Sequence, residues 1–280
     1  MNKLKMVVTD LDGTLLQTDH SISQVDMDTL NLLGELGICR VAATGRNPFK
    51  LRRAIFPSHP FDYVICSSGA CIIDWRSQEI IRAINFQEQI SEQLIQYLIE
   101  KEYNFKVADC FPDNHNFFWS KNHECPEIER YIQVHSEMGK AEEVIPGKKY
   151  SASQLLLFFP KKSSRFDQVK KELLGRFNEI SIIKTTSPLD EDWTWMEIYP
   201  KGISKAHGIE EICRLKRIQR SDTLGIGNDF NDLEMLNFTQ LSYVVHNAPD
   251  ELKEKFLISL PYHENGFSHA VRQHLTKEKG

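Results

Sequence analysis

The sequence predicts an α/β fold, in which a Rossmann-like, doubly wound parallel sheet is interrupted by an inserted α+β domain. Three observations lead to this prediction. Short apolar runs alternate with amphipathic helical segments at the start of the 280-residue chain, as they do where strands are buried on both faces. A segment of different, aromatic-rich texture follows, and the alternation then resumes. We therefore expect a core domain of residues 1–85 and 201–280 and an inserted domain of residues 86–200.

The first part of the core alternates strand and helix. The expected order is a strand at 4–9, a helix at 23–37, a strand at 38–46, a short helix at 47–55, a strand at 63–68 and a hairpin at 70–86. Ser23 is placed to cap the first helix, and Gly37 to end it. Asn47 followed by Pro48 is typical of a helix start, because proline suits the first helical position. This order predicts parallel pairing through right-handed crossovers, with the hairpin as the exit from the core.

The inserted segment mixes helices and strands without that regular alternation. It contains expected helices at 91–102, 127–138 and 166–177, expected strands at 153–160 and 179–186, and aromatic-rich stretches at 105–119 and 190–195. These aromatic residues are more typical of a domain core than of a ligand site. The core domain then continues with a helix at 204–215, a strand at 223–227, a short helix from 231, a strand at 241–245, a helix at 251–256 and a last helix near 269.

Composition and charge limit the partners that this chain is expected to bind. The formal net charge is −5, the isoelectric point is about 6.1, and 41% of the residues are hydrophobic. A net negative charge opposes nonspecific binding to nucleic acid or anionic lipid, so we expect a small-molecule partner rather than either of these. No apolar run approaches the roughly 18 residues that span a bilayer, and residues 1–10 hold no signal-peptide core, so a cytoplasmic location is expected.

The spacing of cysteine and histidine excludes two classes of site. The six cysteines are scattered without a CxxC pair, and the ten histidines include no HExxH motif. Such spacing argues against a zinc centre and against a disulfide framework. We expect the cysteines to be reduced structural thiols.

Four groups of polar residues follow predicted strands or begin the helix between them. They are Asp10 and Asp12 after the first strand, Thr44, Gly45 and Arg46 after the second, Lys205 at the start of the helix at 204–215, and GNDFND at 227–232 after the next strand. Ligands of open parallel sheets bind beyond the carboxyl ends of the strands. We therefore expect the four groups to share one crevice.

Two aspartates separated by one residue suit metal-assisted phosphoryl transfer. Asp10 and Asp12 can both point from a strand end into the crevice, and Gly13 permits the turn that this requires. Close carboxylates repel each other, and a hard divalent cation with oxygen ligands, such as Mg²⁺, removes that repulsion. One carboxylate can then act as a nucleophile while the other transfers a proton. Glycosidases instead hold their two carboxylates about 5 Å or more apart on separate elements.

Each group also has a structural explanation of its own. The DLDGT sequence at 10–14 and Thr44 could be ordinary turn residues, Lys205 a solvated surface cation and GNDFND a capped helix start. All four explanations would have to hold independently at strand ends. A single shared site accounts for them together.

These motifs together resemble the haloacid dehalogenase (HAD) superfamily, in particular its Cof-type, subclass IIB phosphatases. The first motif is similar to DLDGTL at 10–15, the second to TGR at 44–46, the third to Lys205 within PKGISKAHGI, and the fourth to GNDFNDLEML at 227–236. The motifs occur in the family's order over nearly the whole chain. The resemblance implies a HAD-like catalytic core and a cap domain of type C2B at residues 86–200.

The resemblance also implies a role for each matched residue. Asp10 would be the nucleophile and Asp12 the acid/base. Thr44, Gly45 and Lys205 would bind the transferred phosphoryl group. Mg²⁺ would be held by the Asp10 carboxylate, the Asp12 backbone carbonyl and the fourth motif, for which Asn228 and Asp232 are the expected ligands. Arg46, Ser68, Gly69 and Asn231 would contact the substrate or support these groups.

Two positions depart from the family's pattern. The fourth motif is usually GDxxND, whereas Asn228 stands here at the first acidic position and Asp229 is displaced by one. An amide oxygen can bind Mg²⁺ but carries no charge, so Asn228, Asp229 or Asp232 could supply the ligand. Ser68 replaces the asparagine that often precedes the Gly-Ala pair after the third strand. A serine hydroxyl can still donate a hydrogen bond to a phosphate, although its reach is shorter.

We therefore expect a Mg²⁺-dependent phosphoric monoester hydrolase that acts on a small phosphorylated metabolite through an aspartyl-phosphate. The resemblance implies a sugar phosphate as the leading substrate class. Two alternatives use the same motifs. One is a phosphotransferase or mutase that passes the phosphoryl group to a hydroxyl, and the other is a weakly catalytic protein that binds a phosphorylated ligand, which Asn228 suggests. The sequence indicates neither the exact substrate nor the oligomeric state.

Overall fold

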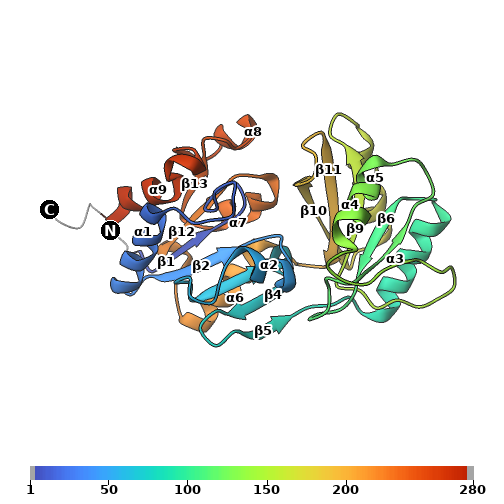
Figure 1. The fold of residues 1–280 in the computed structure, drawn as a ribbon, viewed down its shortest axis with the longest axis horizontal. Coiled ribbons are helices and arrows are strands. Elements are labelled where there is room, and N and C mark those ends of the chain that lie inside the picture. The colour runs from blue at the N-terminus through green and yellow to red at the C-terminus, as the bar shows by residue number, and fades with distance from the viewer. Residues whose placement is uncertain (1–3, 276–280) are drawn as a thin grey trace. The chain divides into compact units, whose positions relative to one another are not determined.

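The computed structural model describes residues 4–275 and divides the chain into two compact units. The first unit contains residues 4–46, Lys50–Arg82 and 204–275, and the second contains Asn47–Phe49 and Ala83–Ile203 (Figure 1). The expected domain boundaries lie a few residues from these divisions, but no sequence pattern indicated that Asn47–Phe49 groups with Ala83–Ile203. Each unit has its own sheet, and the two are described separately.

An eight-stranded sheet forms the centre of the first unit. Its strands lie in the order β14-β13-β12-β1-β2-β3-β4-β5. Their bounds are β1 Met6–Thr9, β2 Cys39–Ala43, β3 Tyr63–Cys66, β4 Cys71–Asp74, β5 Glu79–Ala83, β12 Thr223–Gly227, β13 Leu241–Val245 and β14 Leu257–Ser259. Neighbouring strands from β14 to β3 pair in parallel, and β4 is antiparallel to β3. Because β1 lies between β2 and β12, strand ends from both halves of the chain meet beside it.

Helices cover this sheet. They are α1 Gln24–Glu35, α2 Pro48–Ala54, α6 Lys205–Lys216, α7 Leu233–Phe238, α8 Asp250–Lys253 and α9 Gly266–Leu275, with the 3₁₀ turns η1 Ser67–Gly69, η2 Arg220–Asp222, η3 Phe230–Asp232 and η4 Tyr262–Glu264. Helix α1 packs beside α9, and α6 packs beside α7 (Figure 1). Met6, Val8 and Ile65 of the sheet share one apolar cluster with Ile209 of α6 and Met235 of α7. This cluster is a core of the first unit.

The second unit is built on a six-stranded sheet in the order β10-β11-β9-β6-β7-β8. Its elements are α3 Glu88–Glu100, β6 Phe105–Ala108, β7 Phe117–Ser120, α4 Pro126–His135, β8 Ala141–Glu143, β9 Gln154–Pro160, α5 Arg165–Arg176, β10 Ile180–Thr186 and β11 Trp193–Pro200. Leu155 and Leu157 of β9 pack with residues of α3 and α5, whereas Leu156 and Phe158 pack with residues of α4. Successive residues of β9 thus serve opposite faces of the sheet.

The α/β fold and its parallel central sheet are confirmed, and the differences lie in strands that were not assigned, among them the eight-residue β11. The Ser23 hydroxyl accepts a hydrogen bond from the Asp26 N–H and caps α1, as predicted. Strand β14 was not predicted, because Leu257 and Ile258 are both about half exposed and leave no alternating pattern. Strands β6 and β7 lie in the aromatic-rich stretch at 105–119, for which no strand was assigned. Phe117 belongs to a core cluster of the second unit, as expected.

Two further expectations concern cysteines and membrane spans. All six cysteines are free thiols. Among residues 4–275, no helix combines the length and the apolar character that crossing a bilayer requires.

Candidate active site

The expected site residues gather at the carboxyl ends of four neighbouring strands of the first unit. The strands lie in the order β12-β1-β2-β3, and they are followed by Asn228, Asp10, Thr44 and Ser67, respectively. The Asp10 N–H donates to the Ile226 carbonyl at 2.9 Å, which continues the ladder between β1 and β12. The Thr44 N–H donates in the same way to a β3 carbonyl at 2.8 Å. Backbone pairing therefore places these residues side by side.

Lys205 forms buried ion pairs with two carboxylates. Its Nζ atom lies 2.6 Å from Oδ1 of Asp10 and 2.6 Å from Oδ1 of Asp232. The Lys205 side chain is 0% exposed and the Asp10 side chain 6% exposed. Lys205 lies 195 residues after Asp10 in the sequence. The fold therefore joins the first and third motifs through a direct contact.

Burial and the charge of the ion-pair partner shift the pKa values of Asp10 and Lys205 in opposite directions. Burial raises the pKa of Asp10 to about 8, because desolvation of its carboxylate outweighs the attraction of Lys205, and the charges of Asp232 and Asp12 add to the rise. Burial lowers the pKa of Lys205, but the two carboxylates outweigh burial and hold that pKa above its ordinary value. The lysine therefore stays charged. A further positive charge beside Asp10 would stabilise its ionised form.

A close backbone contact at Gly69 sets the position of the helix that carries Lys205. Gly69 has a φ of +112°, and a Cβ atom there would lie 2.0 Å from the Ser204 carbonyl oxygen. Only glycine permits both this φ and this approach. The Ser204 hydroxyl accepts a hydrogen bond from the His207 N–H at 3.3 Å and caps α6. Because Lys205 directly follows this cap, its position depends on Gly69.

Asp12 is held by Arg46 in a bidentate ion pair. Nε of Arg46 lies 2.7 Å from Oδ2 of Asp12, and Nη2 lies 2.6 Å from Oδ1. Burial lowers the pKa of Arg46, but the bonds and charge of Asp12 outweigh it and raise that pKa overall. The Asp12 side chain is 47% exposed, in contrast to the buried Asp10. The two carboxylates therefore have different surroundings, which suits them to different tasks.

Thr44 and the η1 turn are held together at the same sheet edge. Oγ1 of Thr44 accepts a hydrogen bond from the Arg46 N–H at 3.1 Å, which leaves the hydroxyl proton to be donated. The Ser68 N–H donates to the Thr44 carbonyl at 3.0 Å. Ser67 and Ser68 have φ values of +48° and +54°, which serine rarely adopts. Gly45 lies half-buried between Thr44 and Arg46.

The fourth motif packs against the turn that follows Asp12. Oδ1 of Asn228 accepts a hydrogen bond from Oγ1 of Thr14 at 3.2 Å. A Cβ atom on Gly13, whose φ is +72°, would lie 2.5 Å from Nδ2 of Asn228. Oδ2 of Asp232 accepts hydrogen bonds from the N–H groups of Asn228 and Asp229 at 2.8 and 3.1 Å. One carboxylate of the fourth motif thus holds both its own loop and, through the other oxygen, the lysine of the third motif.

The structure places two residues of the fourth motif away from the bonds to Asp10. The Asp229 side chain accepts the Asp232 N–H and caps the η3 turn. Asn231 lies within η3, and the part of the chain that the structure describes gives its half-buried side chain no hydrogen bond. Sequence reasoning also missed the bond from Thr14 to Asn228. The presence of Thr14 in the DLDGT sequence was the available signal.

The oxygen atoms around Asp10 fit a Mg²⁺ site that uses few protein ligands. Within residues 4–275, no three His, Cys, Asp or Glu side chains converge as a metal cluster. Mg²⁺ does not require one, because it keeps several waters and binds one or two carboxylates together with substrate phosphate. The Asp10 carboxylate, which Lys205 binds through Oδ1, is one hard anionic oxygen donor for the cation. The Asn228 amide oxygen and the Asp12 carbonyl on the adjoining turn are further hard donors of the kind that Mg²⁺ prefers.

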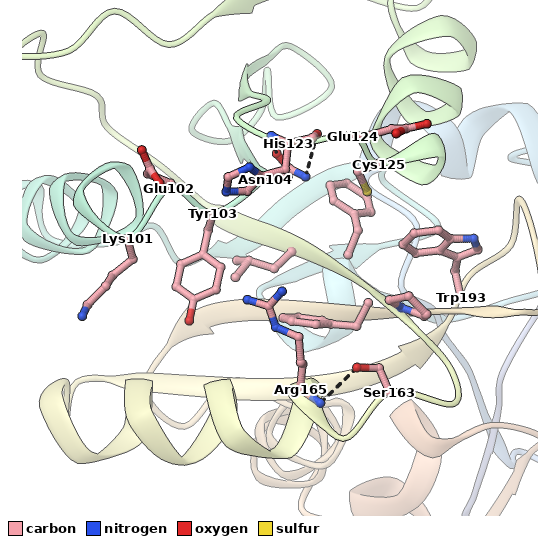
Figure 2. Close-up of a pocket in the computed structure, with 14 residues that line it drawn as sticks. Lys101, Glu102, Tyr103, Asn104, His123, Glu124, Cys125, Ser163, Arg165 and Trp193 are labelled. Atoms are coloured by element: carbon pink, nitrogen blue, oxygen red, sulfur yellow. Dashed lines mark hydrogen bonds between the residues drawn. The ribbon is translucent and has the colours of Figure 1, made fainter.

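The second unit contains a separate pocket of about 320 Å³ at one end of its sheet. Figure 2 shows the side chains of Tyr103, Arg165 and Trp193 around this pocket. Burial raises the pKa of the Cys125 thiol that lines it, which makes the thiol a poor nucleophile. None of the residues that line it is an expected site residue. The carboxylate chemistry therefore belongs to the first unit.

Comparisons with known proteins extend over nearly the whole chain. A family model described as haloacid dehalogenase-like hydrolase matches residues 7–271. The 5-amino-6-(5-phospho-D-ribitylamino)uracil phosphatase YwtE of Bacillus subtilis is 24% identical over 297 aligned positions, which cover 98% of this chain and 99% of that protein. The HMP-PP phosphatase of Yersinia pestis is 20% identical over 90% of this chain and 87% of its own length. The solved HAD subclass IIB sugar phosphatase BT4131 matches with a TM-score of 0.74 at 19% identity, covering 96% of this chain and 98% of its own.

Proposed function

This chain belongs to the haloacid dehalogenase-like hydrolases and is a phosphatase of the Cof type, and we propose that it hydrolyses a small phosphorylated metabolite with Mg²⁺ through an aspartyl-phosphate at Asp10. The observation that carries this proposal is the buried ion pair between Asp10 and Lys205, whose Oδ1 and Nζ atoms lie 2.6 Å apart. Phosphoryl transfer depends mainly on positioning and on charge stabilisation. A carboxylate beside a fixed ammonium at a strand end supplies both.

In the first step, Asp10 attacks the phosphorus atom of the substrate. Its Oδ2 forms the new P–O bond, while the bond from phosphorus to the leaving oxygen breaks. Asp12, which solvent reaches, first takes up a proton and gives up a bond to Arg46. It then donates this proton to the leaving oxygen, so the product leaves as an alcohol. The phosphoryl group remains on Asp10 as a mixed anhydride.

In the second step, water releases the phosphoryl group. Asp12 is now a carboxylate and accepts a proton from the water molecule that attacks phosphorus. The bond between phosphorus and Oδ2 of Asp10 breaks, and inorganic phosphate leaves. The partial exposure of Asp12 supports this double role, because the residue that transfers protons needs access to water.

The negative charge of the phosphoryl group is met by residues from separate strands. Lys205 supplies a fixed positive charge, and Thr44 can donate its hydroxyl proton to a phosphoryl oxygen. Mg²⁺, held by the Asp10 carboxylate, the Asp12 carbonyl and the fourth motif through Asn228, supplies further charge neutralisation when bound. Asp232 orients Lys205 and the Asn228 loop, so we assign it a positioning role within this arrangement.

We propose that the second unit acts as a cap of type C2B that selects the substrate. Two of the compared proteins support a phosphorylated sugar or polyol as the substrate class, because one is named for a phosphoribityl compound and the other as a sugar phosphatase. Both match this chain over the residues of the second unit as well as the first. Exclusion of water by such a unit would strengthen the electrostatic contacts at Asp10.

The variant Asp10→Asn tests the proposal. An amide cannot attack phosphorus, so we expect kcat for 4-nitrophenyl phosphate in the presence of Mg²⁺ to fall by at least about a thousandfold. The measurement is the release of inorganic phosphate without any added acceptor, which also separates hydrolysis from phosphoryl transfer to a hydroxyl. Chelation of divalent cations should abolish the wild-type release, and added Mg²⁺ should restore it.

Asp222→Asn is a matched control for this variant. Asp222 is also buried, and it pairs with Lys5 at 2.9 Å rather than with any expected site residue. We expect this control to keep kcat within about twofold of wild type. Turnover by a folded Asp10→Asn variant at the wild-type rate would refute the assignment of the nucleophile.

A further inference from the structure

The loop after β1 brings His20 to the ion pair between Asp12 and Arg46. Leu16 forms isolated β-bridges with Asp12 and with Ile22, so the loop folds back on itself. The His20 N–H donates to the Gln17 carbonyl at 2.9 Å, and the Gln17 amide donates to an η4 carbonyl at 3.2 Å. His20 has a φ of +64°, a left-handed conformation that is uncommon outside glycine. The loop therefore holds His20 in a defined place in the first unit.

The His20 ring contacts the guanidinium that binds Asp12. Its Nδ1 atom lies 3.4 Å from Nη2 of Arg46, and that same Nη2 atom lies 2.6 Å from Oδ1 of Asp12. A guanidinium has only donors, so Nδ1 is the acceptor and the ring proton is on Nε2. One hydrogen of Nη2 then points to Asp12 and the other to His20. The exposed His20 ring thus adds a further polar contact to the two bonds that Arg46 donates to Asp12.

We propose that His20 is a positioning residue that keeps the Arg46 guanidinium in the plane of the Asp12 carboxylate. An ion pair that solvent reaches contributes little by itself, because long side chains lose rotamer freedom when they are fixed. The Asp12 side chain is 47% exposed and the Arg46 side chain 21%. A third contact at Nη2 restricts the guanidinium without touching the carboxylate. The sequence assigned no role to His20.

The positioned carboxylate serves the leaving group, so this inference rests on the proposed function. As the bond from phosphorus to the leaving oxygen breaks, Asp12 gives its proton to that oxygen. The need for this proton grows with the pKa of the leaving alcohol. A 4-nitrophenolate leaves without help, whereas phenolate benefits from protonation. Asp12 also activates water in the second step, which both substrates share. Loss of positioning at the leaving group should therefore appear in kcat/KM, which reports the first step, and chiefly with the poorer leaving group.

The variant His20→Gly removes the ring without straining the backbone, because glycine accepts a φ of +64°. We expect kcat/KM for phenyl phosphate to fall by about tenfold, a fraction of the contribution of general acid catalysis, while kcat/KM for 4-nitrophenyl phosphate stays within about twofold. His20→Gln keeps an acceptor oxygen for Nη2 and should recover most of the activity on phenyl phosphate.

Ser21→Ala is the matched control on the same loop. The Ser21 hydroxyl donates to Asp19 at 2.6 Å and makes no contact with Arg46, so neither substrate should be affected. Equal losses of kcat/KM on both substrates in His20→Gly, or no loss on either, would overturn the proposal for His20. Asp12→Asn in the same series tests the function itself, since it should reduce turnover of phenyl phosphate steeply. If Asp12→Asn and Asp10→Asn both retain turnover, the proposed function fails instead.

Discussion

Lys205 and Asp10 are stable inside the first unit only as partners. Both side chains are nearly or fully removed from solvent, and an isolated charge in such a place is penalised by several kcal/mol. Removing one partner of a buried ion pair typically costs about 3–5 kcal/mol. The contact used by the proposed chemistry therefore also stabilises the fold. Asp10→Asn tests the chemistry more cleanly than loss of the lysine, because asparagine keeps the size of the side chain and an acceptor for Lys205.

Asp62 offers a pH-dependent test of stability away from the site. Burial raises the pKa of Asp62, but hydrogen bonds and charge from Arg40 and Arg76 outweigh burial and hold that pKa below its ordinary value. The ionised form is therefore favoured in the folded protein. Its contribution is present above the unfolded pKa of about 3.9 and is lost as the pH falls through the lower folded value. We expect Asp62→Asn to lower the free energy of unfolding by about 1–2 kcal/mol at pH 7 and by progressively less below pH 4.

Urea denaturation of the wild type and of Asp62→Asn at pH 7, 5, 4 and 3 measures the difference in their free energies of unfolding. Asp167→Asn serves as the control, because Asp167 is exposed on α5 and its substitution should change the free energy of unfolding at pH 7 by less than about 0.5 kcal/mol. A difference between wild type and Asp62→Asn that stays constant down to pH 3 would contradict the argument.

The sequence predicted which residues form the site where the ends of neighbouring strands bring those residues together. Asp10 and Thr44 follow strands that pair directly, so their proximity followed from the parallel topology. The bond from Lys205 to Asp232 was not predicted, because the spacing of 27 residues between them says nothing about which carboxylate the ammonium meets. His20 was missed for a similar reason. Its place depends on how the loop after β1 folds back, and no local pattern indicates that.

At the scale of elements, the short η1 turn determines where α6 begins. We expect Gly69→Ala to lower the free energy of unfolding by about 3 kcal/mol, since a methyl group there meets the Ser204 carbonyl and the backbone has a φ of +112°. Lys205 should shift with the start of α6, so kcat should fall by at least about tenfold. Thermal unfolding and phosphate release measure the two effects.

Gly175→Ala is the corresponding control in a helix of the second unit. Apart from its chain neighbours and the backbone of its own helix, no atom lies within 4 Å of a Cβ built on Gly175, and alanine favours helix by up to about 1 kcal/mol over glycine. This variant should therefore be as stable as wild type or more so, with kcat unchanged. A Gly69→Ala protein with wild-type kcat would show that the start of α6 tolerates displacement.

Strands of the first unit were predicted well where they are apolar runs, whereas β6 and β11 of the second unit were not assigned although they are largely buried. Strands β1, β2, β3, β12 and β13 were all expected, because strands buried on both faces read as apolar runs. The backbone of η1 was not foreseen, since Ser67 and Ser68 adopt positive φ values that local sequence does not require of serine. Only the packing around the turn selects that conformation.

At the scale of the whole molecule, each unit has a core of its own. A substitution that leaves a cavity in one core should therefore not change the stability of the other unit. Leu157 is 1% exposed within the core of the second unit, and Leu157→Ala should lower its stability by about 2–5 kcal/mol. Hydrogen exchange should then lose protection in peptides from Ala83–Ile203 and keep it in peptides from the first unit.

Leu236→Ala provides the reciprocal measurement. Leu236 is 1% exposed in a core of the first unit, so its loss should reduce protection there and spare the second unit. A uniform loss of protection across both units in either variant would mean that the chain unfolds as one cooperative body.

The split of the first unit into stretches on either side of Ala83–Ile203 has a consequence for synthesis on the ribosome. Strand β1 is made early, but its neighbour β12 begins only at Thr223, after the whole second unit has been translated. One edge of β1 therefore lacks its native neighbour β12 at a time when the second unit can already fold. Domains in general fold as units during translation. A nascent chain that stops before residue 205 has both aspartates of the first motif but no ammonium to face them. The protein thus becomes an enzyme only after the second unit and Lys205 have been translated.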